Sequence, residues 1–251
     1  MDKRFCGTAH RASGQPMMRA IIITGALGSV ALTITPASAQ LNANKRADLS
    51  ASIKLEPGQG AIIVGYRRPD SMSLGKSGAV SFSRYDLATR DLVFQPKGAK
   101  KSGDKTTYSI YVRSGDKTLV QDHAVMVVSA GDYVMTGAIP GGKIIANTFC
   151  LGAPTFSVGA GEGVYFGDVT PYTNVRLVTG DKTPAMAYSS YPEDAQKALA
   201  KQPDLLAKFK VAAIRNEATF GCYGQLMTAY RIPGIASLEP LSPPVSGVAA
   251  K

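Results

Sequence analysis

Apolar and polar side chains alternate along most of this chain, in short runs that are separated by turn-forming residues. The run 61–68 begins with apolar, largely β-branched residues at 61–64, and further on Val80 and Phe82 share one face while Ser81 and Ser83 share the other. A period of two predicts half-buried β-strands. On the same grounds, further strands are expected at 91–94, 106–113, 118–128, 133–139, 143–150, 156–158, 163–168, 174–179 and 218–232.

The stretch from Val125 to Asp168 is a succession of such strands broken by glycine turns, and we interpret it as the scaffold of the fold. Its large apolar residues are spaced to face a core: Tyr133, Phe156, Val158 and Phe166. Upstream, residues 114–117 (Ser-Gly-Asp-Lys) separate two strand-like runs. Gly and Asp supply the dihedrals of a tight turn, so a β-hairpin is expected there.

The hydrophobic period changes to three and four only at 192–210, where Pro192 and Pro203 stand at the starts of two short predicted helices. Many short strands with few helices indicate an antiparallel β-sandwich or a partly open barrel. We therefore predict one mainly β domain over 61–235 that includes the helical insert 192–210. The polar segment 40–60 is expected to be loose or an edge strand, and 236–251 is expected to be a disordered Pro-rich tail.

The N-terminus has the pattern of an export signal. Arg19 precedes an uncharged run at 20–35, and the small residues 37–39 follow it. The run is short for a transmembrane helix, so we expect residues 1–39 to be a signal peptide cleaved after Ala39. The protein would then be periplasmic or secreted.

The position of the start codon affects only this leader. Met17 or Met18 would place an ordinary short charged region before the apolar run, whereas Met1 gives a long one. The alternative starts stay open.

Loss of the leader changes the charge. It removes four of the 28 basic and one of the 18 acidic side chains, which lowers the net charge from +10 to +7. A positive excess favours contact with anionic surfaces such as envelope polymers, and export makes nucleic acid a poor partner. The positive charge is densest at Lys97, Lys100, Lys101 and Lys105. These lysines form either a contact surface for an anionic ligand or a solvated hairpin loop.

Two cysteines remain after the leader is lost. In an oxidising compartment Cys150 and Cys222 are expected to form a disulfide, which would stabilise the domain by about 4 kcal/mol in the chain-entropy model. Two buried free thiols are the alternative, because spacing alone does not place the two Cα atoms within reach.

Residues for catalysis or metal binding are scarce. The mature chain has one histidine, His123, and strand alternation places it and Asp122 on opposite faces, so a triad with Ser129 is not expected. One histidine and two paired cysteines do not make a zinc site. We expect no catalytic, cofactor or metal residues.

One enzymatic alternative stays open at this point. Carboxylates on different strands could converge as the acid and base of a glycoside hydrolase. The candidates are Asp122, Asp132, Glu162 and Asp168.

The central stretch resembles a loose group of bacterial exported domains of unknown function, related in pattern to carboxypeptidase-regulatory-like sandwiches. The residues that carry the resemblance are Gly131 and Tyr133, with Ala130 in place of a proline, and then Phe156, Val158, Gly161, Tyr165, Gly167 and Asp168. It covers about forty residues and departs by one residue in register. The resemblance implies a sandwich fold and export, and it carries over no catalytic residues.

The leading hypothesis is therefore an exported, non-enzymatic β-sandwich protein that binds a protein partner or an anionic envelope polymer. A carbohydrate-active hydrolase with paired carboxylates is the first alternative. A structural component that assembles by strand edges is the second.

Overall fold

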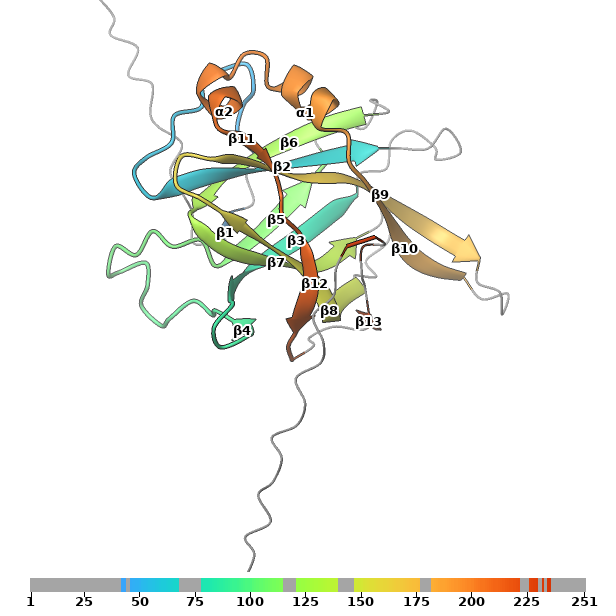
Figure 1. Cartoon of the computed structure of the whole chain (residues 1–251). Coiled ribbons are helices and arrows are strands. Elements are labelled where there is room, and N and C mark those ends of the chain that lie inside the picture. The colour runs from blue at the N-terminus through green and yellow to red at the C-terminus, as the bar shows by residue number, and fades with distance from the viewer. Residues whose placement is uncertain are drawn as a thin grey trace, which may run out of the picture. The chain divides into compact units, whose positions relative to one another are not determined.

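The computed structural model describes residues 42–43, 46–67, 78–114, 121–139, 147–176, 182–221, 226–229, 232 and 234–235. They form two curled β-sheets that pack face to face, with two short helices on one of them (Figure 1). This confirms the predicted fold class, a mainly β sandwich or partly open barrel with two short helices near the C-terminus.

The first sheet is the larger. Its strands lie in the order β1 (Asn42–Ala43), β5 (Ser109–Arg113), β3 (Ala79–Asp86), β7 (Gly131–Ile139), β8 (Asn147–Val158) and β12 (Arg215–Thr219). Two short strands pair off this path, β4 (Asp91–Leu92) with β3 and β13 (Leu226–Ala229) with β8. The two residues of β1 correspond to the edge-strand alternative for segment 40–60.

The second sheet is the smaller. Its order is β10 (Lys182–Ser189), β9 (Gly163–Arg176), β2 (Gln59–Arg67) and β6 (Gln121–Ser129), with β11 (Phe209–Val211) beside the start of β9. Most neighbours in the molecule are antiparallel, but β2 and β9 are parallel. This central parallel pair was not expected, because the sequence contains no strand–helix–strand unit that would suggest one.

The main core fills the space between the two sheets. The expected core residues Tyr133, Phe156, Val158 and Phe166 are all buried within it. The Phe82 ring contacts both Phe156 and Phe166 edge-on, with ring centroids 5.5 and 5.0 Å apart. Edge-to-face aromatic pairs of this kind add to the gain from burial alone.

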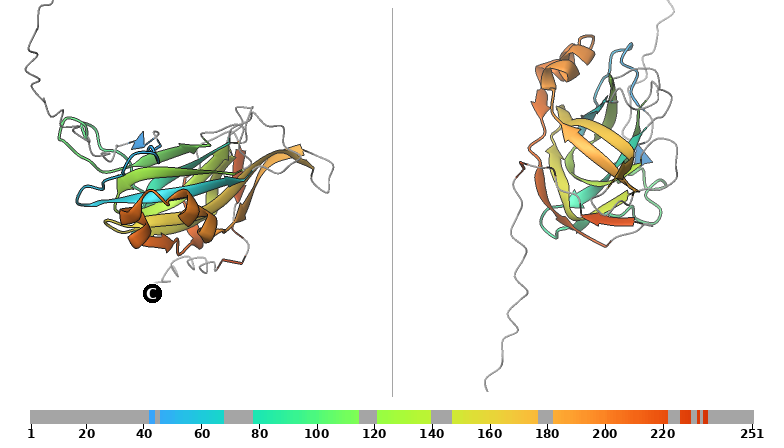
Figure 2. Two further views of the ribbon diagram at one scale, coloured as in Figure 1. Left: turned by 90° about the horizontal axis from the view of Figure 1, so that it is seen from above. Right: turned by 90° about the vertical axis from the view of Figure 1, so that its right-hand side faces the viewer.

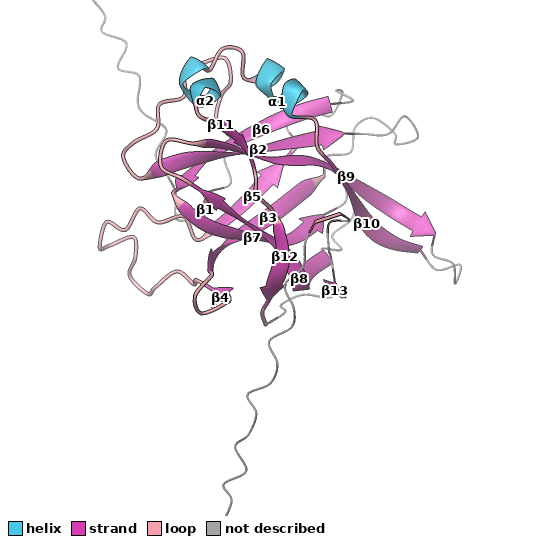
Figure 3. Cartoon of the chain, viewed as in Figure 1, coloured by secondary structure: helices cyan, strands magenta, loops and turns pink. Residues whose placement is uncertain are grey.

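The helices cover a second, smaller core on the outer face of the second sheet. α1 (Pro192–Ala198) and α2 (Pro203–Ala207) each begin at a proline, which fits the first helical turn because its missing N–H would have no partner there. Leu199 and Leu205 pack against Ile63 and Tyr165. Figures 2 and 3 show the helices grouped on this one face.

The prediction of a β-hairpin formed by 106–113 and 118–128 is wrong. β5 pairs with β3 in the first sheet, whereas β6 pairs with β2 in the second. A Gly-Asp turn allows the chain to reverse, but it does not decide whether the next strand returns to the same sheet or crosses to the other. The choice of sheet depends on which arrangement buries the apolar faces of both strands in the core.

Several strand boundaries also differ from those expected. Residues 147–150 of the predicted strand 143–150 and all of 156–158 lie in β8. Likewise, 163–168 and residues 174–176 of the predicted strand 174–179 lie in β9. The other residues of these two predicted strands lie outside the described ones. Gly152 has a φ of 70° inside β8 and sits where the pairing register shifts. A glycine bulge can lie within one continuous strand, but in the sequence alone such a glycine resembles a turn between two strands.

Some predictions fall outside the described residues. These are the signal peptide 1–39, with its alternative starts, the tail 236–251 and Cys222. In the described part of the chain, no helix has the length and hydropathy to cross a membrane.

Candidate functional site

The four predicted lysines lie on one long connection between β4 and β5, which we call the lysine loop (residues 93–108) and which extends to the left in Figure 1. Backbone hydrogen bonds close it: Lys101 and Ser102 both donate to the Gly98 carbonyl, at 2.8 and 3.1 Å. Ala99 is buried against Tyr108. The loop therefore has a defined conformation of its own.

The lysine side chains project from this loop, and all four are exposed. Lys105 forms an ion pair with Glu56, with 3.2 Å between Nζ and Oε2. Within the described residues, no carboxylate contacts Lys97, Lys100 or Lys101. Three positive charges on the loop are thus left without a counterion from the described part of the chain.

One acidic residue, Asp104, belongs to the lysine loop, and its carboxylate bonds to other residues of that loop. Asp104 accepts hydrogen bonds from the Tyr108 hydroxyl at 2.7 Å and from the Thr106 backbone N–H at 2.8 Å. The bond from Tyr108 is the main reason why the pKa of Asp104 is lowered. This carboxylate braces the loop and does not neutralise the three lysines by direct contact.

Phe94 is a residue of this region that the sequence pattern missed. It was assigned to a strand at 91–94, but β4 ends at Leu92 and the Phe94 side chain is 61% exposed. A large apolar side chain in an expected strand is normally taken as buried. Only its exposure in the folded chain shows that it lies on the surface of the lysine loop.

A polar pocket of about 460 Å³ adjoins the loop, and Lys105 belongs to both. Its lining is Glu56, Pro57, Gly58, Gln59, Lys105, Thr106 and Ser129. Carboxylate, amide, ammonium and hydroxyl groups all contribute to its wall. Pockets of 300 to 1,000 Å³ are of the size that binds small molecules or single polymer units.

The wall of the polar pocket is fixed on both sides by backbone hydrogen bonds. Ala130 N–H donates to the Gly58 carbonyl at 2.7 Å, and Gly161 N–H donates to the Gln59 carbonyl at 2.6 Å. Ser129 is held by Thr107, through two reciprocal bonds of 2.8 and 3.0 Å between side chain and backbone. The pocket is preformed.

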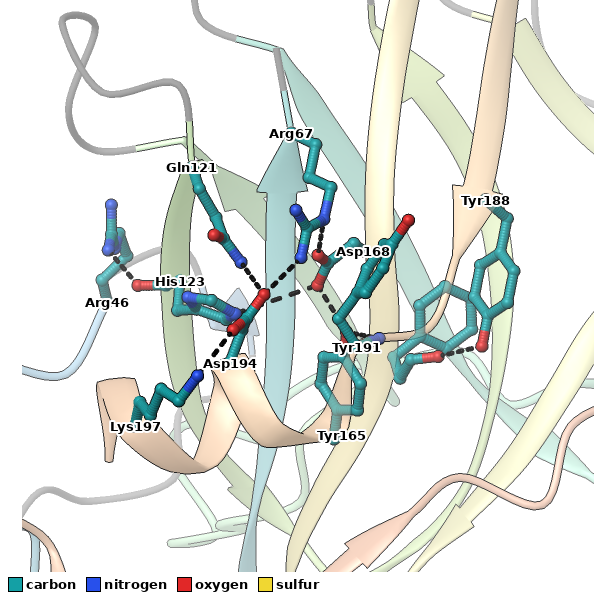
Figure 4. Close-up of polar contacts among 11 residues, drawn as sticks. Arg46, Arg67, Gln121, His123, Tyr165, Asp168, Tyr188, Tyr191, Asp194 and Lys197 are labelled. Carbon is teal, nitrogen blue, oxygen red and sulfur yellow. Dashed lines mark hydrogen bonds and ion pairs between the residues drawn. The ribbon is translucent and has the colours of Figure 1, made fainter. Parts of the chain in front are cut away.

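A second polar cluster, which we call the Asp168 network, lies at the other end of β2 (Figure 4). Asp168 is fully buried and accepts hydrogen bonds from Arg67 Nε and the Tyr165 hydroxyl. Its carboxylate lies over Gly65, where a Cβ would overlap Asp168 Oδ1. A glycine at 65 is what makes room for the buried charge.

Arg67 connects the Asp168 network to helix α1. Arg67 Nη2 donates to Asp194 Oδ2 at 2.7 Å. The guanidinium also stacks on the Tyr191 ring, with Arg67 Cζ 3.6 Å from the ring centroid. The hydrogen bond from Arg67 is the main cause of the lowered pKa of Asp194. These contacts anchor the helix on the sheet, so we assign the network a structural role.

His123 completes the Asp168 network. Its side chain is buried, and Nε2 has no hydrogen-bond partner among the described residues, although it lies 3.8 Å from Asp168 Oδ1. Burial lowers the pKa of the His123 imidazole. Asp122 instead pairs with Arg46 at 2.8 Å, which confirms that Asp122 and His123 face opposite sides of β6.

The other candidate catalytic groups are dispersed. Ser129 lies at the opposite end of β6 from His123, about 20 Å away at the rise of a β-strand. Asp132 accepts a hydrogen bond from Ser157, and Glu162 pairs with Lys210. Among the described residues, the four acidic candidates thus bond to different side chains.

Two remaining site predictions concern metal binding and the disulfide. The described residues contain no cluster of three or more metal-ligating side chains. Cys150 is buried, and its carbonyl accepts a hydrogen bond from Phe220 N–H at 3.1 Å. That bond brings the chain leading to Cys222 beside Cys150, and the disulfide stays a prediction because Cys222 lies outside the described residues.

Comparison with known proteins adds no assignment to this geometry. No family model, curated protein or solved structure matches the sequence. The resemblance to carboxypeptidase-regulatory-like sandwiches therefore stays a prediction.

Proposed function

We propose that this is an exported, non-enzymatic binding protein that holds an anionic polymer of the cell envelope on its lysine loop. The observation that carries the proposal is three exposed lysines, 97, 100 and 101, on a loop with a defined backbone. None of the carboxylates in the described ranges contacts them. Clustered charge of one sign attracts polyions at long range. A loop that is already ordered loses little conformational entropy on binding.

Export is part of the same proposal. It is supported by the uncharged run 20–35 and the small residues 37–39. We expect the mature protein in the periplasm or the medium, starting at Gln40. Intact-mass analysis of the exported protein tests this start.

The binding proposal is preferred to a hydrolase because of where the acidic residues lie. A glycoside hydrolase needs two carboxyl groups about 5 to 10 Å apart on either side of the scissile bond. Asp168 is fully buried beneath its partners, and Asp122, Asp132 and Glu162 each contact a different basic or hydroxyl group.

Assembly through strand edges remains a weaker alternative. β10 lies at an edge of the second sheet and pairs only with β9 among the described strands. Pro184 falls at the irregularity in that pairing, between Thr183 and Ala185. Proline cannot donate to a further strand, and it is a common means of blocking edge addition.

Binding to defined polyanions tests the proposal. We expect the purified protein to bind inorganic polyphosphate and oligogalacturonate at low salt and to release them as salt rises. Exchange of lysines 97, 100 and 101 for Gln should weaken binding of both probes by at least about tenfold. The matched control removes three exposed charges elsewhere, at Arg113, Lys197 and Lys201. Equal binding by the two triple variants would refute the lysine loop as the site.

A further inference from the structure

The polar pocket beside the lysine loop has a mixture of charges that the anion-binding proposal does not explain. Glu56 contributes a carboxylate to its wall, directly next to Lys105. A bare phosphate or carboxylate in the pocket would be repelled by this group. Because the Glu56 carboxylate and the Lys105 ammonium offset each other, a neutral polar group suits the pocket better than a bare anion.

The hydrogen-bonding groups of the pocket suit hydroxyls. Both side-chain contacts to Glu56 reach Oε2, from Lys105 at 3.2 Å and from Gln59 Nε2 at 3.5 Å. Among the described residues, Oε1 has no hydrogen-bond donor. A hydroxyl both donates and accepts, so it can donate to Oε1 while accepting from the Lys105 ammonium.

The remaining wall holds fixed polar groups, which favour the same class of ligand. The Gln59 side chain is buried and its Oε1 accepts the Glu56 backbone N–H at 3.0 Å, so the amide and the carboxylate are held side by side. Ser129 adds a hydroxyl to the lining. Fixed donors and acceptors at several points can distinguish adjacent hydroxyl groups on a sugar ring.

We propose that the polar pocket is a saccharide subsite, so that the polymer held by the lysine loop is an acidic glycan. Sugar hydroxyls bind at Glu56, Lys105 and Ser129, while acidic groups on neighbouring sugar units contact Lys97, Lys100 and Lys101. This inference rests on the proposed function, since the lysine loop supplies the binding of the acidic groups. A polymer of phosphate alone would use the lysines and leave the pocket empty.

The Glu56→Gln variant separates charge from sugar recognition, because the two effects have opposite signs. Loss of the negative charge should strengthen polyphosphate binding or leave it unchanged. Loss of a charged acceptor should weaken oligogalacturonate binding by about tenfold, the range expected for a hydrogen bond to a charged group. Titration calorimetry with both probes measures this difference.

The matched control is Glu193→Gln, which removes the same charge from an exposed position on α1. We expect it to change the affinity for either probe by less than about twofold, because exposed charges at long range are screened. Thermal unfolding checks that both variants are folded. If Glu56→Gln does not fold, Glu56→Asp withdraws the carboxylate by one methylene and should also weaken only oligogalacturonate binding.

The outcomes distinguish the two proposals. If Glu56→Gln strengthens the binding of both probes alike, the saccharide subsite is wrong and the lysine loop binds anions by charge only. If the triple lysine variant binds both probes as tightly as the unaltered protein, the proposed function itself is wrong. Selective loss of oligogalacturonate binding in Glu56→Gln supports the acidic glycan.

Discussion

At the scale of single residues, the buried Asp168 carboxylate places the strictest demands on its surroundings. An isolated charge in a protein interior is strongly unfavourable, so it must be paired and hydrogen-bonded. Arg67 and Tyr165 supply these contacts, and Gly65 supplies the space. Alternation along β6 predicted that Asp122 and His123 face opposite sides, but it did not predict that His123 would lie against Asp168.

The position of His123 predicts a pH dependence of stability. Burial lowers the pKa of His123 in the folded protein below its usual value near 6.5 in the unfolded chain. The unfolded state therefore binds more protons, and stability falls as pH drops from about 7 through the folded pKa. We expect the free energy of unfolding, measured by urea titration between pH 7.5 and 5, to decrease over this window.

The variant that checks the origin of this effect is His123→Gln. It removes the only histidine outside residues 1–39, so the decrease between pH 7 and 5 should flatten. Asp194 and Glu162 also have lowered pKa values, because of Arg67 and Lys210, but they lose their contribution only at lower pH. An unchanged pH profile in the variant would show that His123 is not responsible.

At the scale of elements, one side chain ties the N-terminal segment to the helices. Gln202, between α1 and α2, is buried and accepts the Ile53 backbone N–H at 2.8 Å. Its amide nitrogen donates to the carbonyls of Leu49 and Ala51 at 2.9 and 2.8 Å. These bonds hold residues 49–53 just before the pocket wall at 56–59.

Gln202→Ala should release that segment. The change leaves one backbone N–H and two carbonyls without their partners, and we expect a loss of about 2 to 3 kcal/mol in the free energy of unfolding. Amide exchange at Ile53 should become faster. Gln196→Ala, at an exposed position on α1, is the control and should stay within about 0.5 kcal/mol of the unaltered protein. Protection of Ile53 that survives Gln202→Ala would contradict this role.

At the scale of the whole molecule, a link between β8 and the end of the chain would close the fold. The hydrogen bond between Phe220 and Cys150 places these two segments side by side. β12 pairs with β8 over the residues that precede it. Closure of a loop of this length by a disulfide restricts the unfolded chain and so stabilises the folded one.

We expect thiol titration of the denatured, unreduced mature protein to find no free thiol at Cys150 or Cys222. Replacement of both by serine should lower the free energy of unfolding by up to about 4 kcal/mol. Reduction of the unaltered protein should produce a similar loss, whereas it should leave the double variant unchanged. Two free thiols in the mature protein would rule out the bridge.

The sequence by itself determined the fold class and the faces of the strands, because alternation and helical period depend only on local spacing. The core positions of Tyr133 and Phe166 and the two proline-started helices followed from it. The lysine cluster was also evident. Only the tertiary structure decided which strands pair, since β5 and β6 are neighbours in the chain but lie in different sheets.

The candidate site depended on tertiary structure even more. Glu56 and Lys105 are 49 residues apart, and Ser129 comes from a third segment, so no local pattern brings them together. The same holds for Arg67, His123 and Asp168, which come from three strands. Hydrophobic periodicity predicts which face of its strand or helix a residue occupies. The choice of its neighbours requires the packing of the whole core, and that choice creates the pocket beside the lysine loop.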